Sequence, residues 1–231
     1  MCNLFCSPNI QIAGVTFQVF ADSPFKEDTF SEKLKSFVVT TPSVDVVRVQ
    51  YQFSLPAENE VCYGRLVYKH APWRIYQALN GWSYVCFSEN SLVPLNQIAQ
   101  CNNQHDNFVV FFPDSSIFKK GGFQSVVLIP TDQIILAPIL AERQACLIHS
   151  AGLIFNGAGL LFVGHSEAGK STMVKLLRDE SEILCDDRII LRRWPDGIKI
   201  HGTWSHGEIP DVSPASAPLR ALLFLEKAPH N

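Results

Sequence analysis

A segment of this sequence has the residue spacing of a phosphate-binding loop, G-x-x-x-x-G-K-S. The segment consists of Gly164, His165, Ser166, Glu167, Ala168, Gly169, Lys170, Ser171 and Thr172. The glycines let the backbone point successive N–H groups at a phosphate, the lysine neutralises the outer phosphates, and the serine hydroxyl is a ligand for Mg²⁺. The pattern predicts a nucleoside triphosphate site with Mg²⁺; the alternative is a glycine turn that ends in Lys-Ser.

Two aspartates supply a second group of chemically useful side chains. Asp186 and Asp187 directly follow a short apolar run at 182–185. Adjacent side chains at a strand end point in different directions, so one carboxylate can reach Mg²⁺ while the other accepts a proton from an attacking hydroxyl. An ordinary Asp-Asp turn is the alternative, and the upstream loop favours the functional interpretation.

His149 is the third candidate, within an apolar strand expected over 146–155. A single histidine in such a strand is commonly a core residue. The functional interpretation rests on the order of the features: the histidine, a hairpin turn at 156–159, the phosphate loop and then the aspartates.

The flanking pattern provides the elements that would position these residues. The run 159–163 is apolar and predicts a strand that enters the loop, and 171–178 predicts a helix with one apolar side. The run 131–145 predicts another helix, interrupted by Pro138. Alternating runs upstream predict a β-rich N-terminal half with strands at 10–20, 46–53, 64–68, 73–77, 82–87, 107–112 and 125–129.

Composition limits the class of protein. The chain has 231 residues, of which 47% are hydrophobic and 18% charged, so a folded core is expected rather than disorder. A net charge of −3 predicts neither nucleic acid nor a membrane as a partner. Seven cysteines without paired spacing, and no signal peptide, predict a cytoplasmic protein with reduced thiols. We expect a β-rich domain over 1–130 and a nucleotide-binding domain over 131–231.

The region around the loop resembles the HPr serine kinase/phosphorylase family, especially its HPr-kinase-like relatives, whose fold is similar to phosphoenolpyruvate carboxykinases. The resemblance lies in 147–152, 156–159, 164–172 and 184–188, with weaker similarity at 202–208 and 217–221. It implies an α/β class, with an HPr-kinase-like phosphate-loop domain that follows a smaller β-rich domain.

The resemblance also implies an activity, the ATP-dependent phosphorylation of a serine in a protein or peptide acceptor. By position, Asp186 is then the catalytic base, His149 assists, Lys170 binds phosphate, and Ser171 with Asp187 holds Mg²⁺. Self-association into a homo-oligomer is implied too, because members of the family form rings.

Two departures leave alternatives open. The glycine-rich and charged segment that follows the aspartates in HPr kinases is not recognisable, so HPr itself is not indicated as the acceptor. The sequence stops at Asn231, where relatives continue with helices that cover the site. A small-molecule kinase or carboxykinase-type enzyme, or a non-catalytic nucleotide-binding regulatory module, remains an alternative. Three residues in the loop after 200, His206, Glu208 and Asp211, are candidates for the acceptor side; an ordinary solvated loop is the alternative.

Overall fold

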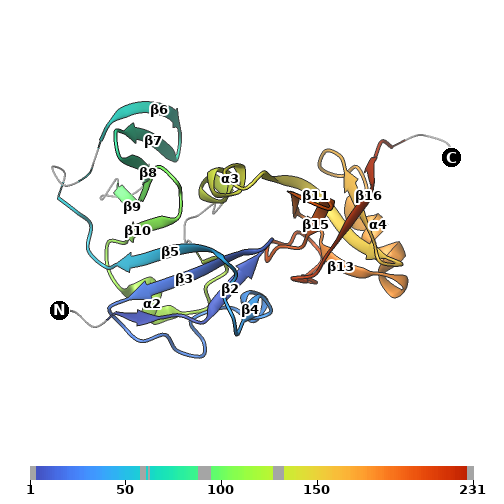
Figure 1. The fold of residues 1–231 in the computed structure, drawn as a ribbon, viewed down its shortest axis with the longest axis horizontal. Helices are drawn as coiled ribbons and strands as arrows, with labels where there is room; N and C mark the ends of the chain where they lie inside the picture. Colours follow the sequence, from blue (N-terminus) through green and yellow to red (C-terminus); the bar gives the residue numbers. More distant parts are fainter. Residues whose placement is uncertain (1–3, 58–60, 62, 88–94, 127–132, 228–231) are drawn as a thin grey trace. The chain divides into compact units, whose positions relative to one another are not determined.

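A computed structural model describes residues 4–57, 61, 63–87, 95–126 and 133–227 (Figure 1). The fold divides into two compact units. The first consists of Met1–Ile10, Val15–Ser31 and Val38–Ile139, and the second of Gln11–Gly14, Glu32–Phe37 and Leu140–Asn231. The domain boundary predicted near residue 130 falls within 127–132, outside the described residues.

The predicted α/β class with an HPr-kinase-like phosphate-loop domain is wrong. Strands make up 47% of the described residues and helices 14%, and the strands form two mixed sheets. A parallel, doubly wound sheet needs a helical crossover between successive strands. In the described part of the second unit, one α-helix follows the phosphate loop. β14 (Arg188–Trp194) pairs antiparallel with β11 (Ala145–Phe155) and with β15 (Gly197–His201), and β16 (Ser216–Phe224) pairs parallel with β12 (Ala158–Val163).

The first unit is built on a long mixed sheet with the order β4-β2-β3-β5-β10-β9-β8-β7-β6, in which β1 pairs with β3. The strands are β1 (Phe5–Cys6), β2 (Asn9–Ile12), β3 (Val15–Ala21), β4 (Val38–Val39), β5 (Asp45–Gln52), β6 (Arg65–His70), β7 (Trp73–Ala78), β8 (Gly81–Phe87), β9 (Leu95–Asn102) and β10 (Asn107–Phe111). The β-rich character expected of the N-terminal half is present.

Among the described residues, three short helices accompany these strands along the chain: α1 (Glu32–Lys35), α2 (Ser116–Lys120) and α3 (Gln133–Ala141). The last of them lies within the helix predicted over 131–145 and continues through Pro138, but it ends at Ala141, four residues before the predicted end; 131–132 lie outside the described residues. No helix among the described residues is both long and apolar enough to span a bilayer. In the first unit, buried Tyr51 packs edge-on against Phe112 and donates a 2.6 Å hydrogen bond to the Val126 carbonyl.

The described part of the second unit contains a six-stranded sheet whose pairing closes on itself. Its strands are β11 (Ala145–Phe155), β12 (Ala158–Val163), β13 (Glu182–Cys185), β14 (Arg188–Trp194), β15 (Gly197–His201) and β16 (Ser216–Phe224), with α4 (Lys170–Leu177) and the 3-10 turn η2 (Arg178–Glu180) after β12. The order β12-β16-β15-β14-β11 is completed by the pairing of β11 with β12. Long β11 makes this possible, because its first half pairs with β14 and its second half with β12.

The predicted hairpin before the phosphate loop is present. Antiparallel β11 and β12 are joined by Asn156 and Gly157, whose φ angles of 49° and 75° fit a tight turn with positive φ at both central positions. Gly152 lies within β11 where a Cβ would come 2.6 Å from the Ile189 side chain, so a larger residue would require that buried side chain to shift. Val174 of α4 is buried against Phe162 of β12, which fixes the helix to the hairpin.

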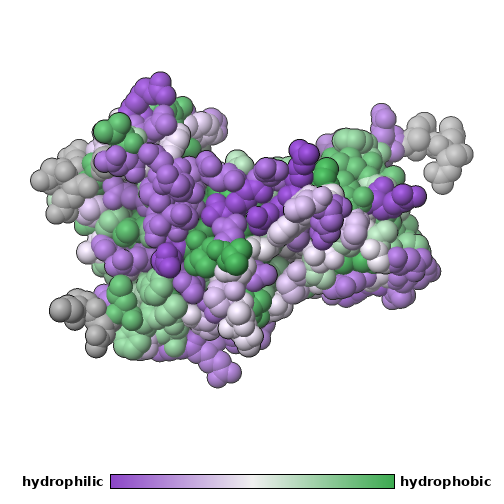
Figure 2. All heavy atoms as spheres, in the orientation of Figure 1, coloured by the Kyte–Doolittle hydropathy of each residue, from purple (hydrophilic) through white to green (hydrophobic). Residues whose placement is uncertain are grey.

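The C-terminal part of β16 leaves apolar side chains on the surface. Leu222, Leu223 and Phe224 are exposed, and Figure 2 shows hydrophobic side chains gathered over the part of the second unit where β16 lies in Figure 1. The final strand therefore contributes a backbone pairing to β12 but buries few of its own last side chains.

Buried His201 predicts a specific dependence of stability on pH. The Trp194 indole N–H donates to its Nε2 at 3.1 Å, which requires a neutral imidazole. Burial, and to a smaller extent the positive charges of Arg192 and Lys199, lowers the pKa of His201 to about 4. Because the unfolded chain takes up the proton near pH 6.5, stability should fall as the pH drops from 6.5 toward 4, by up to about 3 kcal/mol. Chemical denaturation of wild type and His201→Gln across this range checks it, since the variant should show a flatter profile.

Candidate functional site

The phosphate-loop sequence forms the strand–loop–helix expected of it. The loop leaves β12 at Gly164, where a Cβ would lie 2.7 Å from the Ala168 Cβ. Gly169 has a φ of 109° and precedes the first residue of α4, and its carbonyl accepts the Met173 amide at 3.0 Å. Both glycines are therefore required by the backbone path, one by close packing and one by its left-handed conformation.

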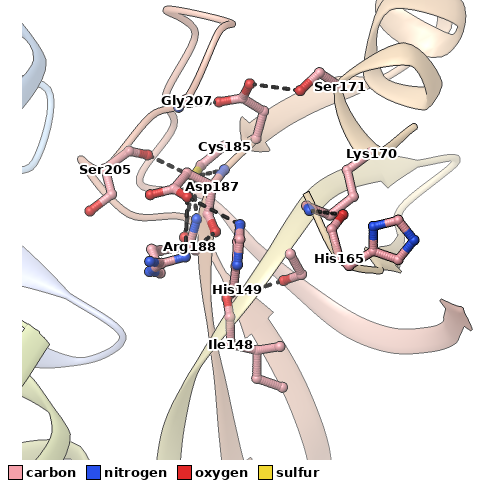
Figure 3. A network of polar contacts seen from close by, with 12 residues as sticks. Ile148, His149, His165, Lys170, Ser171, Cys185, Asp187, Arg188, Ser205 and Gly207 are labelled. Atoms are coloured by element: carbon pink, nitrogen blue, oxygen red, sulfur yellow. Dashed lines mark hydrogen bonds and ion pairs between the residues drawn. The ribbon is translucent and has the colours of Figure 1, made fainter. Parts of the chain in front are cut away.

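Lys170 is folded back onto the loop that precedes it. Its Nζ donates to the carbonyls of Gly164 at 2.9 Å and His165 at 3.0 Å (Figure 3), and the residue is 7% exposed. The ammonium group is thus enclosed by the loop, where it would meet an anion that the loop amides surround. Within the loop, His165 Nδ1 also contacts the Ser166 carbonyl at 2.5 Å.

The rest of the motif lies toward solvent. Exposed positions are His165, Ser166, Glu167 and Thr172, while Ala168 is buried. Glu167 has a φ of 67°, a left-handed conformation that costs a non-glycine residue about 1–2 kcal/mol.

Replacing Glu167 with glycine should remove that strain. We expect Glu167→Gly to raise the free energy of unfolding by about 1 kcal/mol and to tighten binding of Mg²⁺–ATP, because one negative charge leaves the rim. Glu167→Gln is the matched control: it should tighten nucleotide binding without the gain in stability. Calorimetric titration and denaturant unfolding measure both, and a less stable glycine variant would contradict the argument.

Asp186 is a buried carboxylate whose two oxygens are both occupied. It is 3% exposed; Oδ1 accepts the Gly207 amide at 2.6 Å, and Oδ2 accepts the Ile209 amide at 2.9 Å and the Ser171 hydroxyl at 3.3 Å (Figure 3). These donors compensate for the loss of water around the charge. The contact with Ser171 brings the first aspartate to the mouth of the phosphate loop.

Asp187 points to other partners. Its Oδ1 lies 3.5 Å from His149 Nε2 and accepts from Arg188 Nη1 at 3.1 Å (Figure 3). Within the described part of the chain, no donor contacts its Oδ2. The side chains of Arg188, Asp187 and His149 are 21%, 27% and 48% exposed, so this group opens toward solvent at the histidine.

The charges around His149 favour its neutral form. Partial burial has the largest effect and lowers the pKa of His149. The positive charges of Arg188 and Lys170 lower it further, while the negative charge of Asp187 raises it. The imidazole therefore remains neutral near pH 7, with one ring nitrogen able to donate and the other able to accept a hydrogen bond.

Cys185 holds the turn that carries both aspartates. Its thiol contacts the Ser205 carbonyl at 2.7 Å, and its sulfur accepts the amides of Asp187 at 3.2 Å and Arg188 at 3.1 Å. Burial raises the pKa of this thiol above its ordinary value, which keeps it protonated and able to donate. Sequence reasoning missed this role, and its only signal was a cysteine immediately before the aspartates.

The loop after β15 supplies the other partners that the sequence did not reveal. Thr203 donates to the Arg188 carbonyl at 2.6 Å, and the same loop carries the Gly207 and Ile209 amides that bind Asp186. Of the proposed acceptor-side residues, Glu208 pairs with Lys175 at 3.4 Å and Asp211 with Arg178 at 2.9 Å. The first ion pair joins the loop to α4 and the second joins it to the start of η2, and His206 is exposed.

The structure thus brings the phosphate loop, Asp186, Asp187 and His149 to one region of the second unit. Across the described ranges, no three His, Cys, Asp or Glu side chains converge as a metal cluster. A scan against protein-family models finds no match, and a search of curated proteins finds none either.

Proposed function

We propose that this chain is an ATP-dependent serine kinase that transfers the γ-phosphate to a serine of a protein or peptide acceptor. One observation supports this most directly: consecutive aspartates beside a phosphate loop contact different partners. Asp186 contacts the loop serine, whereas Asp187 contacts His149 and keeps one oxygen without a partner in the described structure. A phosphotransferase needs this division between a metal-side carboxylate and an acceptor-side carboxylate.

The loop would bind the triphosphate. Its backbone amides and the start of α4 favour an anion, and Lys170 already lies inside the loop. On binding, the ammonium group exchanges its two carbonyl partners for phosphate oxygens, so the loop needs only a small rearrangement.

Ser171 and Asp186 fit a Mg²⁺ ion, since both are oxygen ligands and their side chains are within 3.3 Å. Mg²⁺ would neutralise charge on the phosphates as the γ-phosphoryl group departs. The Gly207 and Ile209 amides hold the Asp186 carboxylate in one orientation, which limits the positions it can take at the metal.

Asp187 is the better candidate for the base, which reverses the roles implied by the family resemblance. Its Oδ2 can accept the proton of the acceptor serine, whereas both oxygens of Asp186 are engaged. In the step, the serine oxygen bonds to the γ-phosphorus, the bond to the bridging oxygen of ADP breaks, and the hydroxyl proton passes to Asp187. Since the transition state is loose, holding the hydroxyl in line matters more than strong basicity.

A cytoplasmic setting is part of the proposal, because ATP is available there and the described cysteines are free thiols, with the buried ones among them protected from oxidation. Self-association, implied by the resemblance, also belongs to the proposal.

The proposal is tested with γ-phosphate-labelled ATP and Mg²⁺. Without an acceptor, water takes the place of the serine hydroxyl, and slow phosphate release is expected from wild type. Peptides that carry a single serine should accelerate loss of label from ATP and become labelled. Nucleotide binding with neither release nor transfer would indicate a binding module instead.

A further inference from the structure

A base that is to orient a hydroxyl must itself be held, and Arg188 is placed to hold Asp187. Arg188 lies opposite His149 in the antiparallel pairing of β14 with β11, so the two side chains project from the same face. The Asp187 carboxylate lies between them, with Oδ1 in contact with both.

We propose that Arg188 is the positioning residue of the phosphotransfer reaction, fixing Asp187 so that Oδ2 faces the acceptor hydroxyl. This inference rests on the proposed kinase function. It assigns Arg188 no contact with either substrate and confines its action to the carboxylate.

The local geometry gives Arg188 little freedom. Its Nη1 donates to Asp187 Oδ1 at 3.1 Å and to the Asp187 backbone carbonyl at 3.2 Å. One nitrogen therefore binds both the side chain and the backbone of Asp187. Its own backbone is anchored as well: the carbonyl accepts Thr203 Oγ1 at 2.6 Å, and the amide donates to Cys185 Sγ at 3.1 Å. The guanidinium group therefore acts as a fixed point.

Arginine suits this role better than lysine. A planar guanidinium presents donors in fixed directions and keeps its charge, whereas an ammonium group is a mobile point charge. Oδ1 accepts a hydrogen bond from Arg188 and lies 3.5 Å from His149 Nε2, so these contacts favour one orientation of the carboxylate and leave Oδ2 without a donor in the described structure. A carboxylate without this constraint would sample orientations that do not face the acceptor.

Arg188→Gln and Arg188→Lys test the role in the full chain, with Arg193→Gln as the matched control. Arg193 lies on the same strand and its side chain is exposed, so the control removes an equal charge away from Asp187. We expect Arg188→Gln to lower kcat about tenfold to a hundredfold, with KM for ATP within twofold, and Arg188→Lys to recover part of the loss. Arg193→Gln should match wild type.

A double-mutant cycle separates positioning from a general structural effect. If Arg188 acts through Asp187, then adding Arg188→Gln to Asp187→Asn should cost nothing further in kcat. Full additivity, or an Arg188→Gln variant as active as wild type, overturns the inference while leaving the kinase proposal intact. An inactive wild type that still binds ATP overturns both. If Arg188→Gln unfolds, Arg188→Lys and its cycle with Asp187→Asn decide the question.

Discussion

Replacing Asp187 with asparagine should nearly abolish phosphotransfer while leaving ATP binding unchanged. Asparagine preserves the size of the side chain and an oxygen for Arg188, but its amide cannot take up the serine proton. General-base contributions are typically 10²–10⁴-fold, so we expect kcat to fall by about a thousandfold. The dissociation constant for Mg²⁺–ATP should stay within twofold, because in the described structure Asp187 contacts His149 and Arg188 but neither Lys170 nor Ser171.

Asp186→Asn is the contrasting variant. It removes the charge that faces Ser171 and turns an amide group toward the backbone N–H of Gly207 or Ile209, so it should raise the Mg²⁺ requirement about tenfold and lower stability by about 1–3 kcal/mol. Titrations of activity against Mg²⁺, with thermal unfolding, distinguish the two variants. If Asp186→Asn loses transfer at saturating Mg²⁺ while Asp187→Asn retains it, the roles assigned here are reversed.

The sequence predicted the local structure of the site well. Two glycines, the lysine and the serine of the loop impose one backbone path, and Asn156-Gly157 imposes a tight hairpin turn, so these features depend on neighbouring residues alone. For the same reason Asp186 and Asp187 occur directly after a buried strand, as the apolar run before them predicted.

The fold class was beyond this kind of reasoning because it depends on strand pairing. A strand such as β14 looks the same in sequence whether it joins a parallel or an antiparallel neighbour. The decisive feature was the shortness of its connections, a two-residue turn before it and another after it, which leave no length for a crossover helix. A phosphate loop followed by a helix suggested an α/β sheet, but that pattern describes one strand and one helix only.

The partners of the aspartates were hidden for a related reason. Gly207 and Ile209 bind Asp186 through backbone amides, which any sequence possesses, and Arg188 was one of several arginines in a strand. Only the register of β11 against β14 places Arg188 opposite His149. Contacts between residues far apart in the sequence, such as these, show which atoms each aspartate meets, and residue spacing alone does not.

Replacing Lys170 with alanine should remove nucleotide binding, the largest effect expected on affinity. The ammonium group is buried in the loop, and charge-assisted hydrogen bonds to two phosphates are worth about 1.5–3 kcal/mol each. We therefore expect at least a hundredfold loss of affinity for Mg²⁺–ATP, measured by calorimetry or fluorescence titration. Stability should change little, since water can replace Nζ at the carbonyls of Gly164 and His165, neither of which is a buried residue.

Lys175→Ala is the control that separates the specific role from the charge. Lys175 follows Lys170 on the same helix α4, but its side chain is 61% exposed and pairs with Glu208 at 3.4 Å, an ion pair expected to contribute little. Its loss should alter affinity by less than about threefold at physiological salt, where the ionic atmosphere screens an exposed charge. If both variants lost the same affinity for Mg²⁺–ATP, the helix would attract nucleotide by charge alone. The proposal that the loop is the nucleotide-binding site would then be wrong.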